Sequence, residues 1–136
     1  MTYALDTNII IHYLRDEPNV RDKIKSVMLM GDDIIIPNVV SYEVNRGFKV
    51  QSSPKKERAY QILTEKNGFC DIVEIGSNTW KRAEEVYEKL YRKCLTVGEL
   101  DILIAAFCLE YGCTLVTNNV KHFKDIDGLI IEDWLG

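Results

Sequence analysis

Short apolar runs alternate along the chain with longer segments whose apolar residues recur at helical spacing. The short runs are rich in β-branched and aliphatic residues, and they predict strands at residues 3–5, 34–37, 69–75, 113–117 and 128–133. The longer segments predict helices at residues 7–15, 20–30, 41–50, 55–67, 79–92 and 95–112. Such alternation is typical of an α/β fold with a mostly parallel sheet and helices on both faces.

The same spacing predicts which helix faces are buried. The segment 95–112 is apolar nearly all round, so we expect a buried helix there. The helix at 55–67 is expected to end at Asn67 and Gly68. The helix at 79–92 is expected to bury one face that carries Trp80, Ala83, Val86, Tyr87 and Leu90.

Length and composition indicate one globular domain over residues 1–136. Hydrophobic residues make up 46% of the chain and charged residues 28%. No apolar run approaches the roughly 20 residues that span a bilayer, and the first residues lack a signal pattern, so we expect a cytoplasmic protein without a membrane segment. The net charge of −4 gives no overall attraction to nucleic acid, so such binding requires a local basic patch or metal ions.

The four cysteines lack the spacing of a metal site or a disulfide framework. They are Cys70, Cys94, Cys108 and Cys113, and no two of them form a CxxC pair. We therefore expect small buried thiols in a reducing compartment. A catalytic Cys–His pair is not favoured, because no nucleophile motif surrounds any of the four.

Two carboxylates follow predicted strands. Asp6 follows the first strand, where ligands bind in open α/β sheets, although Asp6 or Thr7 can equally cap the next helix. Glu43 follows the second strand. Its alternative role is structural: Ser41 caps a helix, and Glu43 complements the helix dipole in the first turn.

Asp101 lies in the apolar helix and is the most informative of the acids. An unpaired ionised carboxylate in such a place costs several kcal/mol, and no basic residue occurs between Cys94 and Lys121. Glu99 has a structural explanation, because Thr96 and Glu99 have the spacing of a capping box. If these acids meet, their repulsion requires a cation, and oxygen ligands select Mg²⁺ or Mn²⁺ over zinc.

Several short motifs resemble those of the PIN domain, and more narrowly those of VapC toxins of toxin–antitoxin pairs. The resemblance runs from residue 2 to about 134, and its motifs are Leu5-Asp6-Thr7-Asn8, Ser41-Tyr42-Glu43, Leu100-Asp101-Ile102-Leu103-Ile104-Ala105-Ala106, Leu115-Val116-Thr117-Asn118-Asn119 and His122-Phe123. It implies a three-layer α/β/α fold and a metal-dependent endoribonuclease that hydrolyses RNA phosphodiester bonds. Its implied cofactor is Mg²⁺, for which Mn²⁺ can substitute.

The resemblance also implies roles for individual residues. Asp6, Glu43 and Asp101 match the catalytic, metal-binding acids, and Asn8 matches a supporting polar residue. Thr117 and Asn119 fall in the segment of a fourth acid, where Asn119 replaces the aspartate of many members. An amide contributes no charge there, which weakens the case for a second firmly held metal. Glu99 is an additional candidate acid.

Basic residues near the site segments are candidates for RNA binding. They are Arg46 and Lys49 after the second strand, and Lys121, His122 and Lys124 after the Thr117-Asn118-Asn119 segment. The basic residues within 81–93 are interpreted as a solvated helix face. The resemblance implies an RNA substrate (a tRNA or a ribosomal RNA loop), a cognate antitoxin and a homodimer.

Two other classes remain as alternatives. One is a catalytically weak or inactive PIN-type module that binds RNA or protein. The other is a Mg²⁺-binding, receiver-like signalling domain, although neither 34–40 nor 71–75 ends with an obvious phosphoacceptor. A phosphatase of the DxDxT type is disfavoured, because position 8 is Asn.

Overall fold

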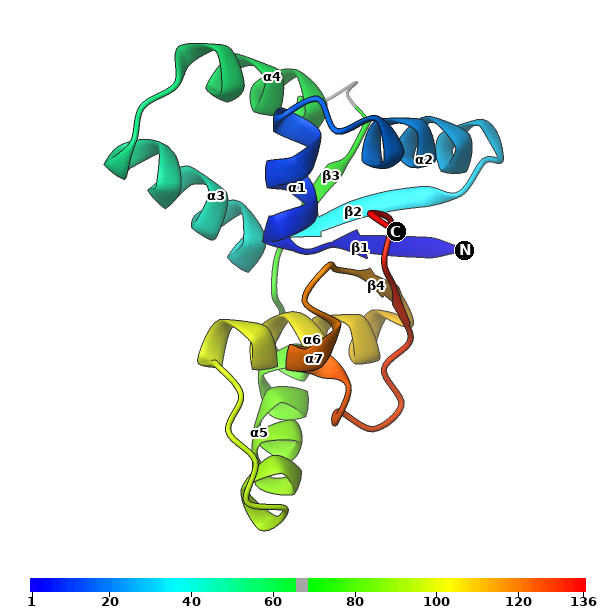
Figure 1. Ribbon diagram of the computed structural model, residues 1–136. Helices are drawn as coiled ribbons and strands as arrows, with labels where there is room; N and C mark the ends of the chain where they lie inside the picture. The colour runs from blue at the N-terminus through cyan, green and yellow to red at the C-terminus, as the bar shows by residue number, and fades with distance from the viewer. Residues whose placement is uncertain (66–68) are drawn as a thin grey trace.

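A computed structural model describes residues 1–65 and 69–136 (Figure 1). Within these residues, five strands form one sheet in the order β3-β2-β1-β4-β5, and each neighbouring pair is parallel. The strands are β1 (Thr2–Leu5), β2 (Asp33–Pro37), β3 (Asp71–Val73), β4 (Thr114–Val116) and β5 (Ile131–Glu132). The parallel α/β prediction is therefore confirmed.

Helices cover both faces of the sheet. They are α1 (Thr7–Leu14), α2 (Pro18–Leu29), α3 (Asn38–Val50), α4 (Pro54–Thr64), α5 (Ser77–Arg92), α6 (Glu99–Tyr111) and α7 (Val120–Phe123). In Figure 1, α1, α2 and α4 lie on one side of the strands, and α5, α6 and α7 lie on the other. This is the expected three-layer arrangement. In the described part of the chain, no helix is long and apolar enough to cross a membrane.

The strand order creates a switch point beside β1. Strand β1 pairs with β2 on one side and β4 on the other, so Ala4 aligns with both Ile35 and Leu115. The chain leaves β1 towards one edge of the sheet and leaves β4 towards the other. Ligands of open parallel sheets bind where the order reverses in this way. The residues that follow β1 and β4 are therefore placed for function.

The core lies between the sheet and its helices, with α6 as its most buried helix. Ile104 and Phe107 of α6 and Leu5 and Leu115 of the central strands are all fully buried. Helix α6 ends at Gly112, whose φ of +67° is the left-handed conformation that terminates many helices. The prediction of a buried apolar helix is confirmed for this segment.

Helices α3 and α6 begin three and four residues away from their expected starts at 41 and 95. Helix α3 begins at Asn38, three residues before the expected start, so Ser41 is not its cap. The Ser41 hydroxyl instead accepts a hydrogen bond of 2.9 Å from the buried Tyr60 hydroxyl. Helix α6 begins at Glu99, with Gly98 as N-cap, so the capping box of Thr96 and Glu99 does not form. Both errors arise because the start of a helix depends on its tertiary neighbours as well as on local caps.

Other differences concern exposure and length. Helix α5 buries Ala83, Val86 and Leu90 as expected and also buries Thr79. Trp80 and Tyr87, which were expected on the same face, are half exposed. Cys94 is exposed, whereas Cys70, Cys108 and Cys113 are buried free thiols as expected. Strands β3 and β5 are shorter than expected, because the residues at both ends of the expected ranges are not part of the strands. The short helix α7 was not expected. Helix α4 ends at Thr64, and its expected end at Asn67 and Gly68 falls outside the described residues.

Candidate active site

Asp6 lies at the carboxyl end of β1, at the switch point. Its side chain is only 3% exposed, and its Oδ1 accepts a hydrogen bond of 2.8 Å from the Thr7 backbone N–H. Asp6 is therefore the N-cap of α1, as one of the two interpretations predicted. Its backbone N–H also donates to the Val116 carbonyl of β4 at 2.9 Å, which fixes it between the two strands.

Two further donors hold the other oxygen of Asp6. The Thr117 hydroxyl donates to Oδ2 at 2.8 Å, and the Asn8 amide donates to the same atom at 3.0 Å. Asn8 also accepts a hydrogen bond of 2.9 Å from the Asn118 backbone N–H, so it ties the start of α1 to the segment after β4. A carboxylate offers about four lone-pair positions. Three are used here, and the remaining one is on Oδ1.

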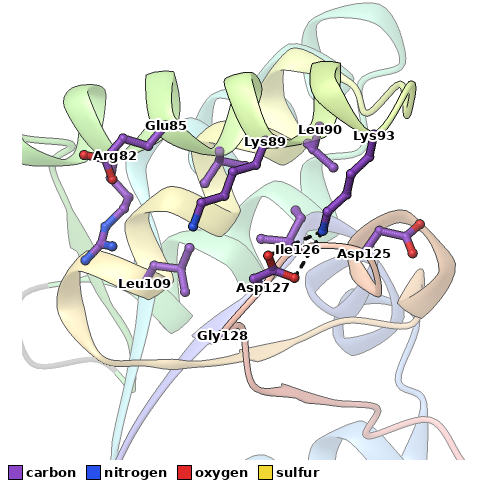
Figure 2. A pocket seen from close by; sticks show the side chains of 11 residues that line it. Arg82, Glu85, Lys89, Leu90, Lys93, Leu109, Asp125, Ile126, Asp127 and Gly128 are labelled. Atoms are coloured by element: carbon purple, nitrogen blue, oxygen red, sulfur yellow. Dashed lines mark hydrogen bonds and ion pairs between the residues drawn. The ribbon is translucent and has the colours of Figure 1, made fainter.

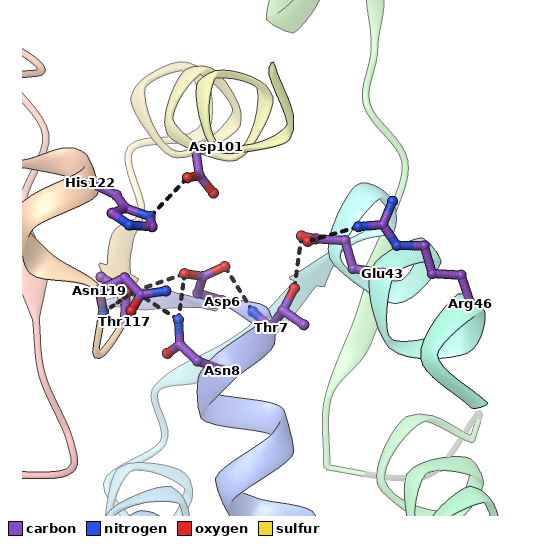
Figure 3. A network of polar contacts seen from close by, with 9 residues as sticks. All are labelled: Asp6, Thr7, Asn8, Glu43, Arg46, Asp101, Thr117, Asn119 and His122. Atoms are coloured by element: carbon purple, nitrogen blue, oxygen red, sulfur yellow. Dashed lines mark hydrogen bonds and ion pairs between the residues drawn. The ribbon is translucent and has the colours of Figure 1, made fainter. Parts of the chain in front are cut away.

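Glu43 approaches the same end of the sheet from α3. Its Oε1 accepts a hydrogen bond of 2.8 Å from the Thr7 hydroxyl, so Thr7 bridges Asp6 and Glu43 (Figure 3). Its Oε2 lies 3.8 Å from Nη2 of Arg46, one helical turn further along. Because α3 begins at Asn38, Glu43 lies in the second helical turn, and the expected first-turn dipole role is wrong.

Asp101 lies in the first turn of α6, and its side chain is 25% exposed. It therefore sits at the solvent-facing end of the helix, and the expected burial inside the apolar segment is wrong for this residue. Its Oδ2 lies 3.1 Å from Nδ1 of His122 on α7 (Figure 3). The expectation that Asp101 has no basic partner nearby in sequence holds, since the histidine follows 21 residues later.

The three acids, here called the acidic cluster (Asp6, Glu43 and Asp101), influence one another electrostatically. Burial raises the pKa of Asp6, the hydrogen bonds from Thr117, Thr7 and Asn8 lower it, and the charge of Asp101 raises it. Burial also raises the pKa of Glu43, and the charges of Asp6 and Asp101 act in the same direction. The fold thus places Asp6 and Glu43 where the charge of Asp101 opposes their ionisation.

The chemistry of the acidic cluster fits a hard divalent cation. All of its donors are carboxylate oxygens. One acceptor position remains on Asp6 and three remain on Asp101, two of them on Oδ1. Within the described residues, however, no three His, Cys, Asp or Glu side chains converge closely enough to coordinate one ion directly. Mg²⁺ usually keeps several waters and contacts only one or two carboxylates. An arrangement of this kind suits Mg²⁺ better than a metal that requires a full protein cage.

The other predicted supporting residues divide into two groups. Thr117 is completely buried and touches Asp6, and its hydroxyl also accepts a hydrogen bond of 3.0 Å from the Asn119 backbone N–H. Asn119 precedes α7, and its side chain makes no capping hydrogen bond. Glu99 is the exposed first residue of α6, and in the described part of the chain no hydrogen bond ties it to the acidic cluster.

The basic candidates lie on both sides of the acidic cluster. Arg46 is beside Glu43, and its guanidinium also lies 5.1 Å from the centre of the Tyr42 ring. Lys49 is exposed on α3, Lys121 is exposed within α7, and Lys124 is exposed just after α7. The sequence favours His122 as an RNA contact or as a residue that packs or hydrogen-bonds beside Phe123, and it does not predict the contact with Asp101. No sequence signal could have found that contact, because it depends on how α7 packs beside α6.

Asp125 and Asp127, which follow α7 in the sequence, line a separate cavity and not the acidic cluster. They line a cavity of about 160 Å³ between α5 and the segment before β5 (Figure 2). In this cavity, Nζ of Lys93 lies 3.2 Å from Oδ1 of Asp127. Its charged lining residues are three cations and three anions (Arg82, Lys89, Lys93, Glu85, Asp125 and Asp127), so the cavity has no marked preference for ligands of one charge.

Comparison with known proteins agrees with this geometry. The PIN domain family matches residues 3–129. "Ribonuclease VapC2" of Rickettsia felis is 32% identical over 134 residues, covering 98% of both chains. "tRNA(fMet)-specific endonuclease VapC" of Shigella flexneri is 27% identical over 135 residues, again covering 98% of both.

Solved structures show the same likeness. The crystal structure of VapBC2 from Rickettsia felis, bound to a DNA fragment from its promoter, matches with a TM-score of 0.85 and 30% identity, over 98% of this chain and 99% of the other. VapBC-1 from nontypeable Haemophilus influenzae matches with a TM-score of 0.82 and 27% identity over the whole of both chains.

Fold and site together define an α/β/α protein with acidic side chains gathered at the carboxyl ends of its parallel strands. This chain belongs to the PIN domain family. Within that family, the relatives to which it is similar along nearly its whole length are VapC ribonucleases.

Proposed function

We propose that this protein is a metal-dependent endoribonuclease that hydrolyses RNA phosphodiester bonds as the toxin of a toxin–antitoxin pair. The observation that carries the proposal is the placement of Asp6, Glu43 and Asp101 around the switch point of the sheet, near enough for the charge of Asp101 to act on the other two acids. A structural role such as helix capping can explain a single acid at this place, but it does not explain three acids that repel one another. The names of the VapC relatives support the same activity.

In the proposed mechanism, the acidic cluster holds Mg²⁺, for which Mn²⁺ can substitute. Thr117 and Asn8 orient Asp6, and Thr7 orients Glu43. When bound, the ion lowers the pKa of a water and offsets the negative charge that develops on the phosphate. Asn119 adds no charge to the site, which favours one firmly held ion over two.

RNA must approach an acidic protein, so basic side chains around the acidic cluster are expected to guide its backbone. Arg46 and Lys49 lie on the α3 side, while Lys121, His122 and Lys124 lie on the α7 side. The substrate class is RNA with an accessible loop, in tRNA or ribosomal RNA. The Shigella flexneri relative, a tRNA(fMet)-specific endonuclease by name, makes tRNA the first substrate to test. This activity would operate in the cytoplasm.

The proposed partner is a cognate antitoxin, because solved relatives are VapBC complexes. A cavity of about 460 Å³ between α1, α3 and the start of α4 offers an apolar surface beside the active site. Ile11, Leu14, Val44 and Phe48 contribute its apolar walls, and Glu43 lies at its edge. An antitoxin segment bound there would lie against the acidic cluster. We also propose a homodimer.

Of the alternatives, the inactive PIN-type module is the one that remains. A receiver-like domain is not supported, since receiver-type sheets have the order 2-1-3-4-5, whereas this sheet has the order β3-β2-β1-β4-β5. The loss of an acid at Asn119 favours the inactive module, and the three remaining acids oppose it. Cleavage measurements separate the two.

The test is to incubate purified protein with total tRNA and with total RNA, in Mn²⁺ or in EDTA, beside Asp101→Asn and Asp6→Asn variants. We expect cleavage in Mn²⁺ only, and a loss of at least about 100-fold in both variants, the upper range for residues that support metal sites. Circular dichroism confirms that each variant is folded. Equal cleavage in Mn²⁺ and EDTA would exclude the metal mechanism, and no cleavage of any RNA would favour the inactive module.

A further inference from the structure

His122 is held in place from both ends of α7. The next residue, Phe123, is fully buried in the core. At the start of the helix, the His122 backbone N–H donates to the Asn119 carbonyl at 3.0 Å, and Asn119 in turn donates to the Thr117 hydroxyl that holds Asp6. The backbone of His122 is therefore tied, through Asn119, to the Thr117 hydroxyl that holds Asp6.

The imidazole touches only one oxygen of Asp101. Its Nδ1 lies 3.1 Å from Oδ2, a contact between a ring nitrogen and a carboxylate oxygen that requires a proton on Nδ1. Among the described residues, Oδ1 of Asp101 has no hydrogen-bond partner. His122 thus fixes one oxygen of the Asp101 carboxylate, and the other oxygen is available to a ligand.

A role in folding stability explains this contact poorly. The His122 side chain is 57% exposed, and ion pairs between exposed groups contribute little to stability. A role in orientation explains it better, because a short carboxylate with one fixed oxygen has fewer rotamers to sample. Asp101 has no other hydrogen bond among the described residues, whereas Asp6 has three.

We propose that His122 is a positioning residue for Asp101, whose Oδ2 it holds through Nδ1–H so that Oδ1 faces the divalent ion. The inference rests on the proposed metal-dependent function and adds a residue to it. His122 acts through Asp101 and does not contact the ion.

The choice of nitrogen makes the proposal testable by substitution. The amide of asparagine can place a donor near the position of Nδ1, whereas the longer glutamine places its amide near Nε2. His122→Asn should therefore keep the contact, and His122→Gln and His122→Ala should lose it. His12, the other histidine of the chain, lies in the last turn of α1 and serves as the control in a His12→Gln variant.

The experiment is an Mn²⁺ titration followed by electron paramagnetic resonance, without RNA, on the whole protein and these variants. We expect His122→Ala and His122→Gln to weaken Mn²⁺ binding by about 10-fold, and His122→Asn and His12→Gln to bind within about threefold of the wild type. Thermal melting checks that each variant is folded. Unchanged or tighter binding by His122→Ala, or equal rescue by Gln and Asn, would overturn the proposal.

Asp101→Asn separates this inference from the proposed function. If Asp101→Asn loses Mn²⁺ and cleavage while His122→Ala binds Mn²⁺ like the wild type, only the positioning role fails. If Asp101→Asn retains both, the proposed metal site itself fails. A hyperfine coupling between bound Mn²⁺ and imidazole nitrogen would also overturn the positioning role, because it would make His122 a ligand.

Discussion

At the residue scale, the site depends on hydroxyl and amide groups as much as on its acids. Thr117 donates to Asp6 and Thr7 donates to Glu43, so each of these carboxylates is held by a threonine from a neighbouring segment. These donors lower the pKa of their acids, while burial raises it. The balance keeps two partly desolvated carboxylates beside each other in a stable fold.

Replacing Thr117 by valine should destabilise the protein. Valine keeps the shape of the buried side chain but removes one of the three donors to Asp6, and an unsatisfied buried group costs about 1–3 kcal/mol. Urea unfolding, monitored by circular dichroism, measures the change. Thr117→Ser, which keeps the hydroxyl, should remain close to the wild type. Equal losses in both variants would point to packing as the cause.

The raised pKa values of Asp6 and Glu43 predict a pH dependence of stability in metal-free protein. Both groups bind protons more readily in the folded state than in the unfolded state, so they favour folding most below their ordinary values of 3.8 and 4.5. This contribution is lost as pH rises through the raised values. In EDTA, the free energy of unfolding of an Asp6→Asn variant should therefore fall less with rising pH than that of the wild type.

Bound Mn²⁺ should counteract the loss of folding stability with rising pH, because it binds only the ionised acids. Its effect on the melting temperature should grow with pH over the same range. Melting curves with Mn²⁺ or EDTA measure both effects. A wild type and Asp6→Asn variant with parallel pH profiles would show that Asp6 does not titrate as expected.

At the element scale, short segments at the ends of β1 and β4 do most of the positioning. Residues 6–8 begin α1 directly after β1, and residues 117–119 lead into α7 directly after β4. The parallel pairing of these strands brings both segments to the same edge of the sheet. Helices α3 and α6 then supply Glu43 and Asp101 from opposite sides of that edge.

Gly47, inside α3, and Gly112, directly after α6, should respond oppositely to replacement by alanine. Gly112 ends α6 with a φ of +67°, so Gly112→Ala should destabilise the protein by about 1–2 kcal/mol. Gly47 lies inside α3, and a methyl group there would meet nothing within 4 Å. Gly47→Ala should therefore stabilise the protein by about 0.5–1 kcal/mol. Chemical unfolding of both variants checks the pair, and a stabilised Gly112→Ala would contradict the left-handed end of α6.

At the scale of the whole molecule, an acidic protein must bind a polyanion through part of its surface. The net charge is −4, yet Arg46 and Lys49 lie on α3, which carries Glu43, and Lys121 and Lys124 lie within and just after α7. Local attraction of this kind is weakened by salt in proportion to the number of phosphates contacted.

Reversing one of these charges should weaken RNA binding and its salt dependence. Each phosphate contact with a single strand contributes about 0.7 to the slope of log affinity against log salt, so Lys49→Glu or Lys121→Glu should reduce the slope by roughly that amount. Lys25→Glu on the distant face of α2 is the control and should change little. Fluorescence anisotropy in EDTA, where RNA is not cut, gives the slopes. Identical slopes for all three variants would exclude these lysines as contacts.

The sequence by itself determined the class of fold and the identity of the acids. Alternation of strand and helix patterns is local information, and it correctly predicted the layers, the parallel sheet and the buried helix α6. The acids were noticeable because Asp6, Glu43 and Asp101 interrupt or border apolar segments, where a charge has a cost that some function must offset. Family motifs carried in the same segments pointed to the same three residues.

Only the tertiary structure decided which polar groups touch these acids and where the helices begin. The pairing of Thr117 with Asp6, Thr7 with Glu43 and His122 with Asp101 joins segments up to 111 residues apart. The start of α3 at Asn38 and the missing capping box at Glu99 likewise follow from packing. Apolar periodicity records which face of an element is buried, but a hydrogen bond depends on distances of a few ångströms between elements, which no single segment encodes.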